Sequence, residues 1–138
     1  MATHSRTRKP LWRRWFGTRS ERAAAKFLKR LGYRIVARNF SCPLGELDLV
    51  ALDGQCVVFV EVRSTEDDKT EKTAASVDEA KQKRLTRLAL AFLQKKRLLN
   101  HAARFDVLII SWPEKAREPV IEHHKNAFEA TGKFQMFS

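Results

Sequence analysis

Residues 45–63 read GELDLVALDGQCVVFVEVR and place two apolar segments on either side of Asp53-Gly54. An Asp-Gly pair between such segments is the strongest short-range signal for a β-hairpin. The second segment is continuously apolar in its middle, which is typical of a central strand buried on both faces. The chain is therefore restricted to folds in which this hairpin lies inside a sheet.

Helical and strand patterns flank the hairpin. Apolar residues at helical spacing predict a helix over 20–31, with Thr18 and Glu21 as a capping box and Gly32 just beyond the helix end. The other predicted elements are strands over 33–40, 45–52, 55–63, 104–111 and 119–124, and a helix from a capping box at Ser76 and Glu79 to about residue 99. This order of elements indicates an α/β sandwich.

The length and composition fit one globular domain, since the 138 residues are 43% hydrophobic and 31% charged. No apolar run approaches the ~20 residues that a membrane-spanning helix needs, so we expect no membrane partner. The cysteines, Cys42 and Cys56, are too few for a disulfide scaffold, and we expect a reducing, cytoplasmic compartment. We expect a basic aromatic arm at 1–16, the domain at 17–130 and a tail at 131–138.

The positive charge is concentrated in the first part of the chain. The net charge is +11, and residues 1–38 hold 12 Lys or Arg and one acid, whereas residues 39–138 hold 15 of each sign. Such asymmetry favours a polyanionic partner, most often nucleic acid, and the alternative is a solubilising tail. The cationic side chains that we expect to contact phosphates are Arg13, Arg14, Arg19, Arg22, Lys26 and Arg38.

Aromatic residues alternate with basic residues in the arm, at Trp12, Trp15 and Phe16. Arginine binds phosphates and tryptophan stacks on bases, so this pattern suits single-stranded or distorted nucleic acid. Two alternatives stay open: a patch that lies on a membrane surface, and an arm whose aromatic side chains pack back on the domain.

Acidic residues interrupt both strands of the predicted hairpin. Glu46 and Asp48 alternate with leucines and so point to one face, and Glu61 interrupts an apolar run where an unpaired charge is costly. Carboxylates gathered in this way repel each other unless a cation neutralises them or one takes up a proton. Oxygen ligands at a partly open site suit Mg²⁺ or Mn²⁺. The alternative is that Arg63 and another base pair with the acids.

The register of the hairpin decides whether these acids meet. If Asp53-Gly54 is itself the two-residue loop, Glu46 lies opposite Glu61 and Asp48 lies diagonal to Glu61. All three acids and Arg63 then share one face. A three-residue loop would shift the register by one and scatter the acids over two faces.

Two further charges lie on apolar helix faces. Glu21 shares the face of Leu28 in the first predicted helix, and Lys81 shares the face of Leu85 in the second. Each is a candidate for the same site as the strand acids. The alternatives are a capping glutamate and a lysine whose stem lies along apolar surface while its charge reaches water.

Short segments in order along the chain match a known pattern: Gly17–Leu28, Gly32-Tyr33, Arg38-Asn39, Gly45–Val50, Val58–Arg63, Ser76-Val77 with Lys81, Arg104–Val107 and Asn126–Phe128. On these segments the chain resembles the YraN-like family of uncharacterised bacterial proteins. That family is similar to the PD-(D/E)XK nucleases, the superfamily of restriction endonucleases and archaeal junction resolvases. The resemblance implies an αβββαβ core with a mixed central sheet flanked by helices.

The resemblance also implies roles for individual residues. Asp48 would be the central metal ligand and Glu61 the second, and the backbone carbonyl of Val62 would complete the site. Glu46 is the extra acid of the family's G-E-x-D segment. Glu21 would match the first-helix glutamate of resolvase-like nucleases.

The chain departs from the nuclease motif at Arg63, where the motif has lysine. Arginine has a very high pKa, so it can stabilise charge but cannot serve as a base. Lys81 is a second cation that would neutralise charge on the reacting phosphate.

The resemblance implies an endonuclease that cleaves DNA phosphodiesters with Mg²⁺ or Mn²⁺, favours branched or structured DNA as junction resolvases do, and forms a homodimer. Two alternatives stay open: a nucleic-acid-binding module with the nuclease fold but no hydrolysis, and a protein-interaction domain whose basic arm docks an acidic partner. Metal titration followed by a cleavage assay separates these three functions.

Overall fold

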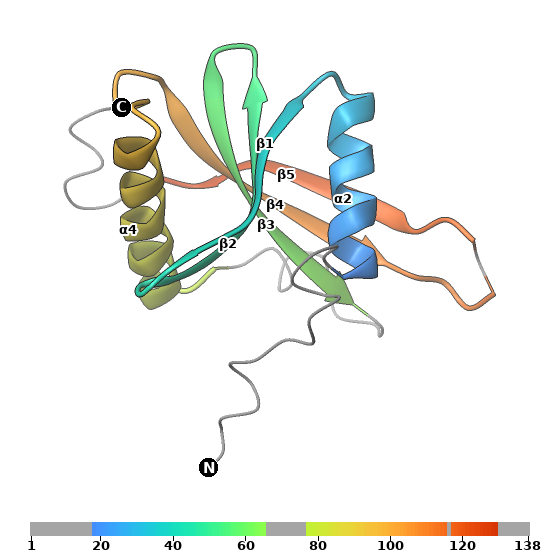
Figure 1. Ribbon diagram of the computed structural model, residues 1–138. Coiled ribbons are helices and arrows are strands. Elements are labelled where there is room, and N and C mark those ends of the chain that lie inside the picture. Colours follow the sequence, from blue (N-terminus) through green and yellow to red (C-terminus); the bar gives the residue numbers. More distant parts are fainter. Residues whose placement is uncertain (1–17, 66–76, 116, 130–138) are drawn as a thin grey trace.

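A five-stranded sheet lies between two helices in the computed structural model of the chain (Figure 1). The structure describes residues 18–65, 77–115 and 117–129. The predicted arm with Arg13 and Arg14, the predicted C-terminal tail and Ser76 lie outside the described residues. Within those described ranges, no helix is long and apolar enough to cross a membrane.

The sheet is mixed, and its strands follow the chain order β1-β2-β3-β4-β5. The elements are α2 (Arg19–Arg30), β1 (Arg34–Cys42), β2 (Gly45–Asp53), β3 (Cys56–Thr65), α4 (Glu79–Lys95), β4 (Ala103–Ser111) and β5 (Val120–Phe128). The β3–β4 pair is parallel because α4 lies in the connection between these strands, whereas the other three pairs are antiparallel. The predicted α/β class with a mixed central sheet is confirmed, and the arrangement is compatible with a restriction-endonuclease-like core.

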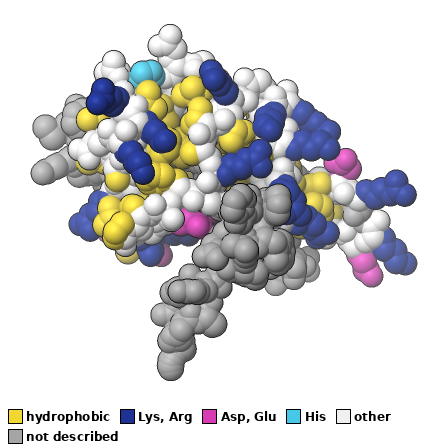
Figure 2. Space-filling model, in the orientation of Figure 1, with side chains coloured by type: hydrophobic (Ala, Val, Ile, Leu, Met, Phe, Trp, Pro, Cys, Tyr) yellow, Lys and Arg dark blue, Asp and Glu magenta, His cyan; other side chains and the backbone are white. Residues whose placement is uncertain are grey.

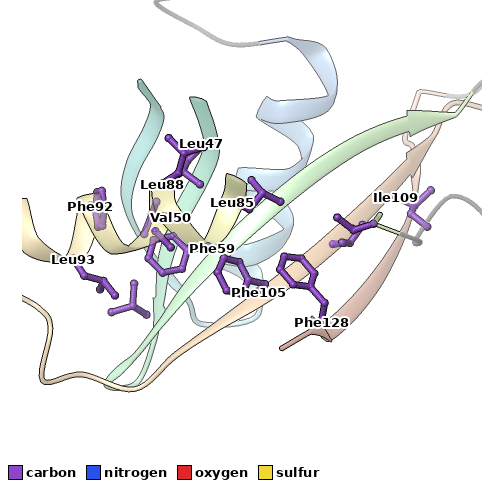
Figure 3. Close-up of a cluster of buried hydrophobic side chains, with 14 residues drawn as sticks. Leu47, Val50, Phe59, Leu85, Leu88, Phe92, Leu93, Phe105, Ile109 and Phe128 are labelled. Atoms are coloured by element: carbon purple, nitrogen blue, oxygen red, sulfur yellow. The ribbon is translucent and has the colours of Figure 1, made fainter. Parts of the chain in front are cut away.

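One face of the sheet packs against α4 (Figure 3). The buried side chains that meet there include Leu88 and Phe92 from the helix and Val50, Phe59 and Phe105 from the strands. The rings of Phe59 and Phe92 meet edge to face, with centroids 5.9 Å apart. Burying each such side chain contributes about 1.5–3 kcal/mol to folding.

The opposite face of the sheet packs against α2. Ala24 and Leu28 from the helix meet Val58 and Val60 of β3 and Ile110 of β4. Because β3 also contributes to the α4 side, it is buried on both faces, as its continuously apolar middle predicts. The sheet therefore separates two apolar cores, and each helix covers one of them.

The capping box of α2 is confirmed. The backbone N–H of Glu21 donates to the Oγ1 of Thr18 at 3.1 Å, and the backbone N–H of Thr18 donates to the Oε1 of Glu21 at 3.0 Å. Gly32 has a φ of +93° just after the helix end, a conformation that glycine adopts without strain.

Helix α4 starts later and ends earlier than its pattern predicts. Asp78, rather than Ser76, is the N-cap, because its side chain accepts the backbone N–H of Lys81 at 2.8 Å. The helix ends at Lys95, since Arg97 adopts a left-handed φ of +59° that stops the helical repeat.

The predicted position of the β2–β3 loop, Asp53-Gly54, is wrong by one residue. The structure pairs Asp53 with Cys56, so Gly54 and Gln55 form the two-residue turn. Gly54 carries the positive φ of +62° at the first central position, where a type II′ turn places glycine, and Asp53 remains in the strand. Each β2 residue therefore lies opposite a β3 residue two positions later than the predicted register gives. Because side chains alternate between the two faces, a shift of two leaves each side chain on its predicted face.

Candidate functional site

Strands β2 and β3 separate at the two acids that the sequence singles out. Their antiparallel pairing runs from Asp53–Cys56 to Leu49–Val60 and ends there, whereas β3 continues beside β4 to Thr65. Asp48 and Glu61 are the first residues beyond the last pair, and we call this point the fork. Figure 1 shows β2 curving away from β3 toward its turn with β1.

The carboxylate of Asp48 bridges the fork. Its Oδ2 accepts the backbone N–H of Val62 at 2.9 Å. This N–H lies just beyond the last β2–β3 pair, so the side chain supplies an acceptor where the neighbouring strand has turned away. The bond fixes the orientation of the Asp48 carboxylate and links the two strands on which the acids lie.

Glu61 lies between two cations. Its side chain is 13% exposed, and its Oε2 lies 2.5 Å from the Nζ of Lys81 and 4.0 Å from the Nε of Arg63. Lys81 therefore makes the closer contact with this carboxylate. The expectation that bases pair with the acids is met for Glu61, with a lysine from a helix as the nearer partner.

Lys81 reaches the fork from the first turn of α4. Its backbone N–H is held by the Asp78 cap, which fixes the place of the helix start. Its side chain is 35% exposed and extends to Glu61, so its ammonium group is bound at the fork as well as facing solvent. Lys81 therefore pairs with Glu61 in addition to reaching solvent, as the alternative of a lysine with its charge in water expects.

Glu46 does not join the other two acids in one cluster. Asp48 and Glu61 line the same small pocket together with Phe59 and Leu85, and Glu46 is not part of its lining. In the described ranges, no three acidic, histidine or cysteine side chains gather closely enough to hold a metal ion.

The side-chain alternation of β2 breaks beside Asp48. Leu47 packs in the core on the α4 side and Leu49 in the core on the α2 side, although residues two apart in a regular strand share a face. Asn39, in the neighbouring strand, has a φ of +50° at the same level. Among the described buried side-chain nitrogens and oxygens, the Oδ1 of Asn39 alone has no hydrogen-bond partner.

Glu21 serves as a helix cap, because its carboxylate accepts the backbone N–H of Thr18. The next residue back, Ser20, hydrogen-bonds through its Oγ to the Oγ of Ser64 in β3. The start of α2 is thereby tied to the strand that carries Glu61, but Glu21 does not line the pocket of Asp48 and Glu61.

The expected phosphate-binding cations that the structure describes lie on two elements. Arg22 and Lys26 are exposed on α2, and Arg38 is exposed on β1. Arg19 also lies on α2, with its guanidinium carbon 3.6 Å from the ring centroid of Trp112. Figure 2 shows Lys and Arg side chains spread over the visible face of the molecule, the α2 side included.

A second polar cluster is centred on Asp106 in β4, whose side chain is 0% exposed. Its Oδ1 accepts the Nε of Arg104 at 3.0 Å and the backbone N–H of Asn126 at 2.9 Å, and its Oδ2 lies 2.7 Å from the Nε2 of His123. Burial pushes the pKa of Asp106 upward, but these hydrogen bonds outweigh it and hold the pKa below its usual value.

Arg104 joins this cluster to the β2–β3 hairpin. It donates to Asp53 at 3.0 Å and to the hydroxyl of Tyr33 at 2.8 Å. Burial alone lowers the pKa of Arg104, but the hydrogen bonds to Asp106 and Asp53 more than compensate and raise it. The sequence signal for Asp106 is the one that marked Glu61, an acid in an apolar strand, but we predicted no role for it.

Comparison with known proteins gives one consistent result. Residues 20–110 match the uncharacterised protein family UPF0102. A UPF0102 protein, RB9115, of Rhodopirellula baltica is 42% identical over 119 residues, which cover 84% of this chain and 71% of that protein. A UPF0102 protein of Syntrophus aciditrophicus is 44% identical over 114 residues, covering 82% and 87%. GSU0650 of Geobacter sulfurreducens, also a UPF0102 protein, is 46% identical over 121 residues, covering 82% and 88%.

Proposed function

This chain belongs to the uncharacterised protein family UPF0102, the YraN-like proteins, and we propose that it is a metal-dependent endonuclease that hydrolyses DNA phosphodiesters at the fork. The observation that carries the proposal is the meeting of Asp48 and Glu61 where β2 leaves β3, with Lys81 in contact with Glu61. Carboxylates that can hold a divalent cation, beside cations that can stabilise phosphate charge, are the groups that this hydrolysis needs.

The donor set of the fork fits Mg²⁺ or Mn²⁺. Asp48 and Glu61 would hold the ion, with the backbone carbonyl of Val62 as a further ligand. All of these are oxygen ligands, and Mg²⁺ in proteins is commonly bound by one or two carboxylates while it keeps several waters. When bound, the ion supplies activation of water and neutralisation of charge on the scissile phosphate.

The chain's own residues orient this site before DNA arrives. The N–H of Val62 holds the carboxylate of Asp48, and the ammonium of Lys81 holds that of Glu61. Both acids are therefore kept at the fork rather than turning into solvent. Such prior orientation lowers the entropy that must be lost when the reacting groups come together.

We assign different roles to the two cations beside Glu61. Lys81 can donate a proton near the attacking water as an ammonium, or accept one as a neutral amine, which is the role of lysine in the motif that this chain resembles. The guanidinium of Arg63 stays charged and stabilises negative charge that develops on the phosphoryl oxygens. The arginine in the motif position therefore does not remove a lysine from the site, because Lys81 reaches the same carboxylate from α4.

The test compares cleavage by variants of two lysines of α4, Lys81 and Lys83. Branched, flapped, single-stranded and plain duplex DNA are incubated with the protein in Mn²⁺. We expect Lys81→Met to lower single-turnover cleavage by roughly 100-fold, the effect of losing one charge-stabilising group. Lys83→Met is the matched control, since Lys83 is exposed on the same helix. Equal cleavage by both variants would contradict the assigned role, and no cleavage of any DNA by the natural protein would contradict the proposed function.

A second candidate function is a nucleic-acid-binding module without hydrolysis. The observation that favours it is the Lys81–Glu61 ion pair, which neutralises this partly buried acid without a metal. Calorimetric titration with Mn²⁺ distinguishes the two functions: the endonuclease binds the ion and Asp48→Asn removes binding, whereas the module shows no heat of binding in either form. The preference for branched DNA and the homodimer stay predictions.

A further inference from the structure

An open groove of about 330 Å³ lies on the α2 side of the sheet. One wall is a flank of α2, and the other is formed where β4 ends and β5 begins. The lining side chains are Ala23, Lys26, Phe27, Arg30, Trp112, Arg117, Glu118, Pro119 and Ile121. Figure 2 shows Lys and Arg side chains on this side of the molecule with apolar surface exposed between them.

The charge of the groove favours an anion. Three of its lining residues, Lys26, Arg30 and Arg117, are cations, and Glu118 is the acid among them. Lys26 and Arg30 lie four residues apart on α2 and so project from the same side of the helix. No salt bridge to another described residue involves any of these three cations.

The floor of the groove is apolar and includes two aromatic rings, those of Phe27 and Trp112. The ring of Trp112 is held in place, because its Nε1 donates to the Oγ of Ser20 at 3.0 Å and the guanidinium of Arg19 lies over it. Phe27 meets the ring of His123 edge to face, with centroids 5.9 Å apart. Rings that are already fixed lose little freedom when a flat ligand packs against them.

We propose that this groove binds one nucleotide of a single-stranded nucleic acid, with its phosphate on Lys26, Arg30 and Arg117 and its base against Phe27 and Trp112. Cations for the backbone beside aromatic rings for the base are the combination that single-strand binding uses. A duplex hides its base faces in the stack and would leave the apolar floor without a partner. The volume of the groove, about 330 Å³, also suits one nucleotide better than a double helix.

A line of hydrogen bonds joins the groove to the fork. Trp112 donates to Ser20, Ser20 bonds to Ser64, and Ser64 follows Arg63 in β3. If the fork cleaves DNA as proposed above, this connection implies that its substrate carries a single-stranded segment, such as a flap or a splayed arm. This part of the inference rests on the proposed function.

Tryptophan emission reads the groove directly. The chain has three tryptophans, so the double variant Trp12→Phe/Trp15→Phe leaves Trp112 as the sole emitter. We expect a short oligo(dT) to quench this emission on stacking, and we expect a duplex of equal length to leave it nearly unchanged. Equal quenching by the duplex, or no quenching by oligo(dT) at concentrations where anisotropy shows binding, would overturn the proposal.

Charge variants then test the phosphate contacts. In the same background we expect Arg30→Gln/Arg117→Gln to weaken oligo(dT) binding roughly tenfold at low salt and to flatten the salt dependence by about 1.4 units of log K per log salt, at ~0.7 per contact on a single strand. Lys83→Gln/Arg87→Gln removes the same charge from exposed positions on α4 and is the control. An equal loss in the control would mean that bulk charge, not the groove, binds the strand.

Two more arms separate this inference from the proposed function. Quenching by oligo(dT) without cleavage of any DNA would support nucleotide binding in the groove and contradict the proposed endonuclease. Cleavage of flapped DNA without quenching would support the endonuclease and contradict nucleotide binding in the groove. Quenching by poly-glutamate as strong as that by oligo(dT) would assign the surface to an acidic protein partner instead.

Discussion

Two clusters in this molecule place acids inside apolar strands, and they satisfy them in opposite ways. Asp106 is fully buried and accepts hydrogen bonds from Arg104, His123 and the backbone of Asn126. Glu61 is partly exposed at the end of a strand pair, and its nearest partner is the long side chain of Lys81.

The partners of each acid indicate whether it stabilises the fold or is available for chemistry. Each partner of Asp106 comes from a strand of the sheet, and although Asp106 lines the same small pocket as Asp48 and Glu61, its carboxylate already accepts four hydrogen bonds from these partners. The partners of Glu61 face solvent in part, so an incoming cation or phosphate can replace or join them. We therefore expect the loss of Asp106 to affect folding and the loss of the fork acids to affect activity.

The largest expected effect is on stability. Asp106→Asn removes the charge that pairs with Arg104 and His123 in the interior, and breaking a buried pair in this way costs about 3–5 kcal/mol. Urea unfolding of both forms measures this loss in the free energy of unfolding. Glu61→Gln is the comparison, and we expect it to cost less than about 1 kcal/mol. Equal losses in the two variants would erase the distinction between the clusters.

The second prediction concerns activity. Asp48→Asn keeps an oxygen that can accept the N–H of Val62, so the fold should be preserved while the carboxylate charge is lost. We expect Mn²⁺ binding to disappear, cleavage to fall by at least about 100-fold, and the melting temperature without metal to stay equal or rise slightly. A melting temperature lower by several degrees with unchanged metal affinity would make Asp48 a structural acid like Asp106.

The third prediction uses pH. The pKa of Asp106 is lowered in the folded chain from its ordinary value of 3.8, because hydrogen bonds outweigh the effect of burial. The unfolded chain therefore binds this proton first as pH falls, so the stabilisation is full above the ordinary pKa and is lost progressively as pH falls through the lower pKa of the folded chain. We expect the free energy of unfolding to fall more steeply in acid for the natural protein than for Asp106→Asn. Parallel curves below pH 4 would show that another group controls acid unfolding.

The smallest expected effect is that of Arg63→Lys. Lys81 already brings an ammonium group to Glu61, so a second lysine should not raise activity, and the lost guanidinium should lower it by a few-fold at most. Single-turnover cleavage in Mn²⁺ across pH measures this. A clear gain would mean that the natural arginine weakens the enzyme and that Lys81 does not perform the lysine role.

Local sequence signals predicted most of the fold. The α2 capping box, the hairpin and the doubly buried β3 are confirmed because each depends on neighbouring residues. The hairpin register was missed because glycine suits either position of a two-residue loop, and the structure places Gly54 first rather than second.

The sequence predicted less of the site, because its contacts join distant segments. The acids Asp48 and Glu61 were marked by their place in apolar strands, and the structure brings both to the fork. The reach of Lys81 depends on how α4 crosses the sheet, which periodicity does not specify. The Asp106 cluster needs β5 to extend to Phe128 rather than to residue 124, so that Asn126 can donate its N–H.

The single parallel pair sets an order of assembly for this molecule. Strands β1, β2 and β3 are joined by tight turns and can form from contacts close in sequence, whereas β3 meets β4 only after the long connection that contains α4 has closed. Lys81 lies in that connection, so it reaches Glu61 only after α4 has packed against the β2–β3 hairpin. A nascent chain that has folded only its first three strands would carry Asp48 and Glu61 without their lysine, and would acquire the complete fork last.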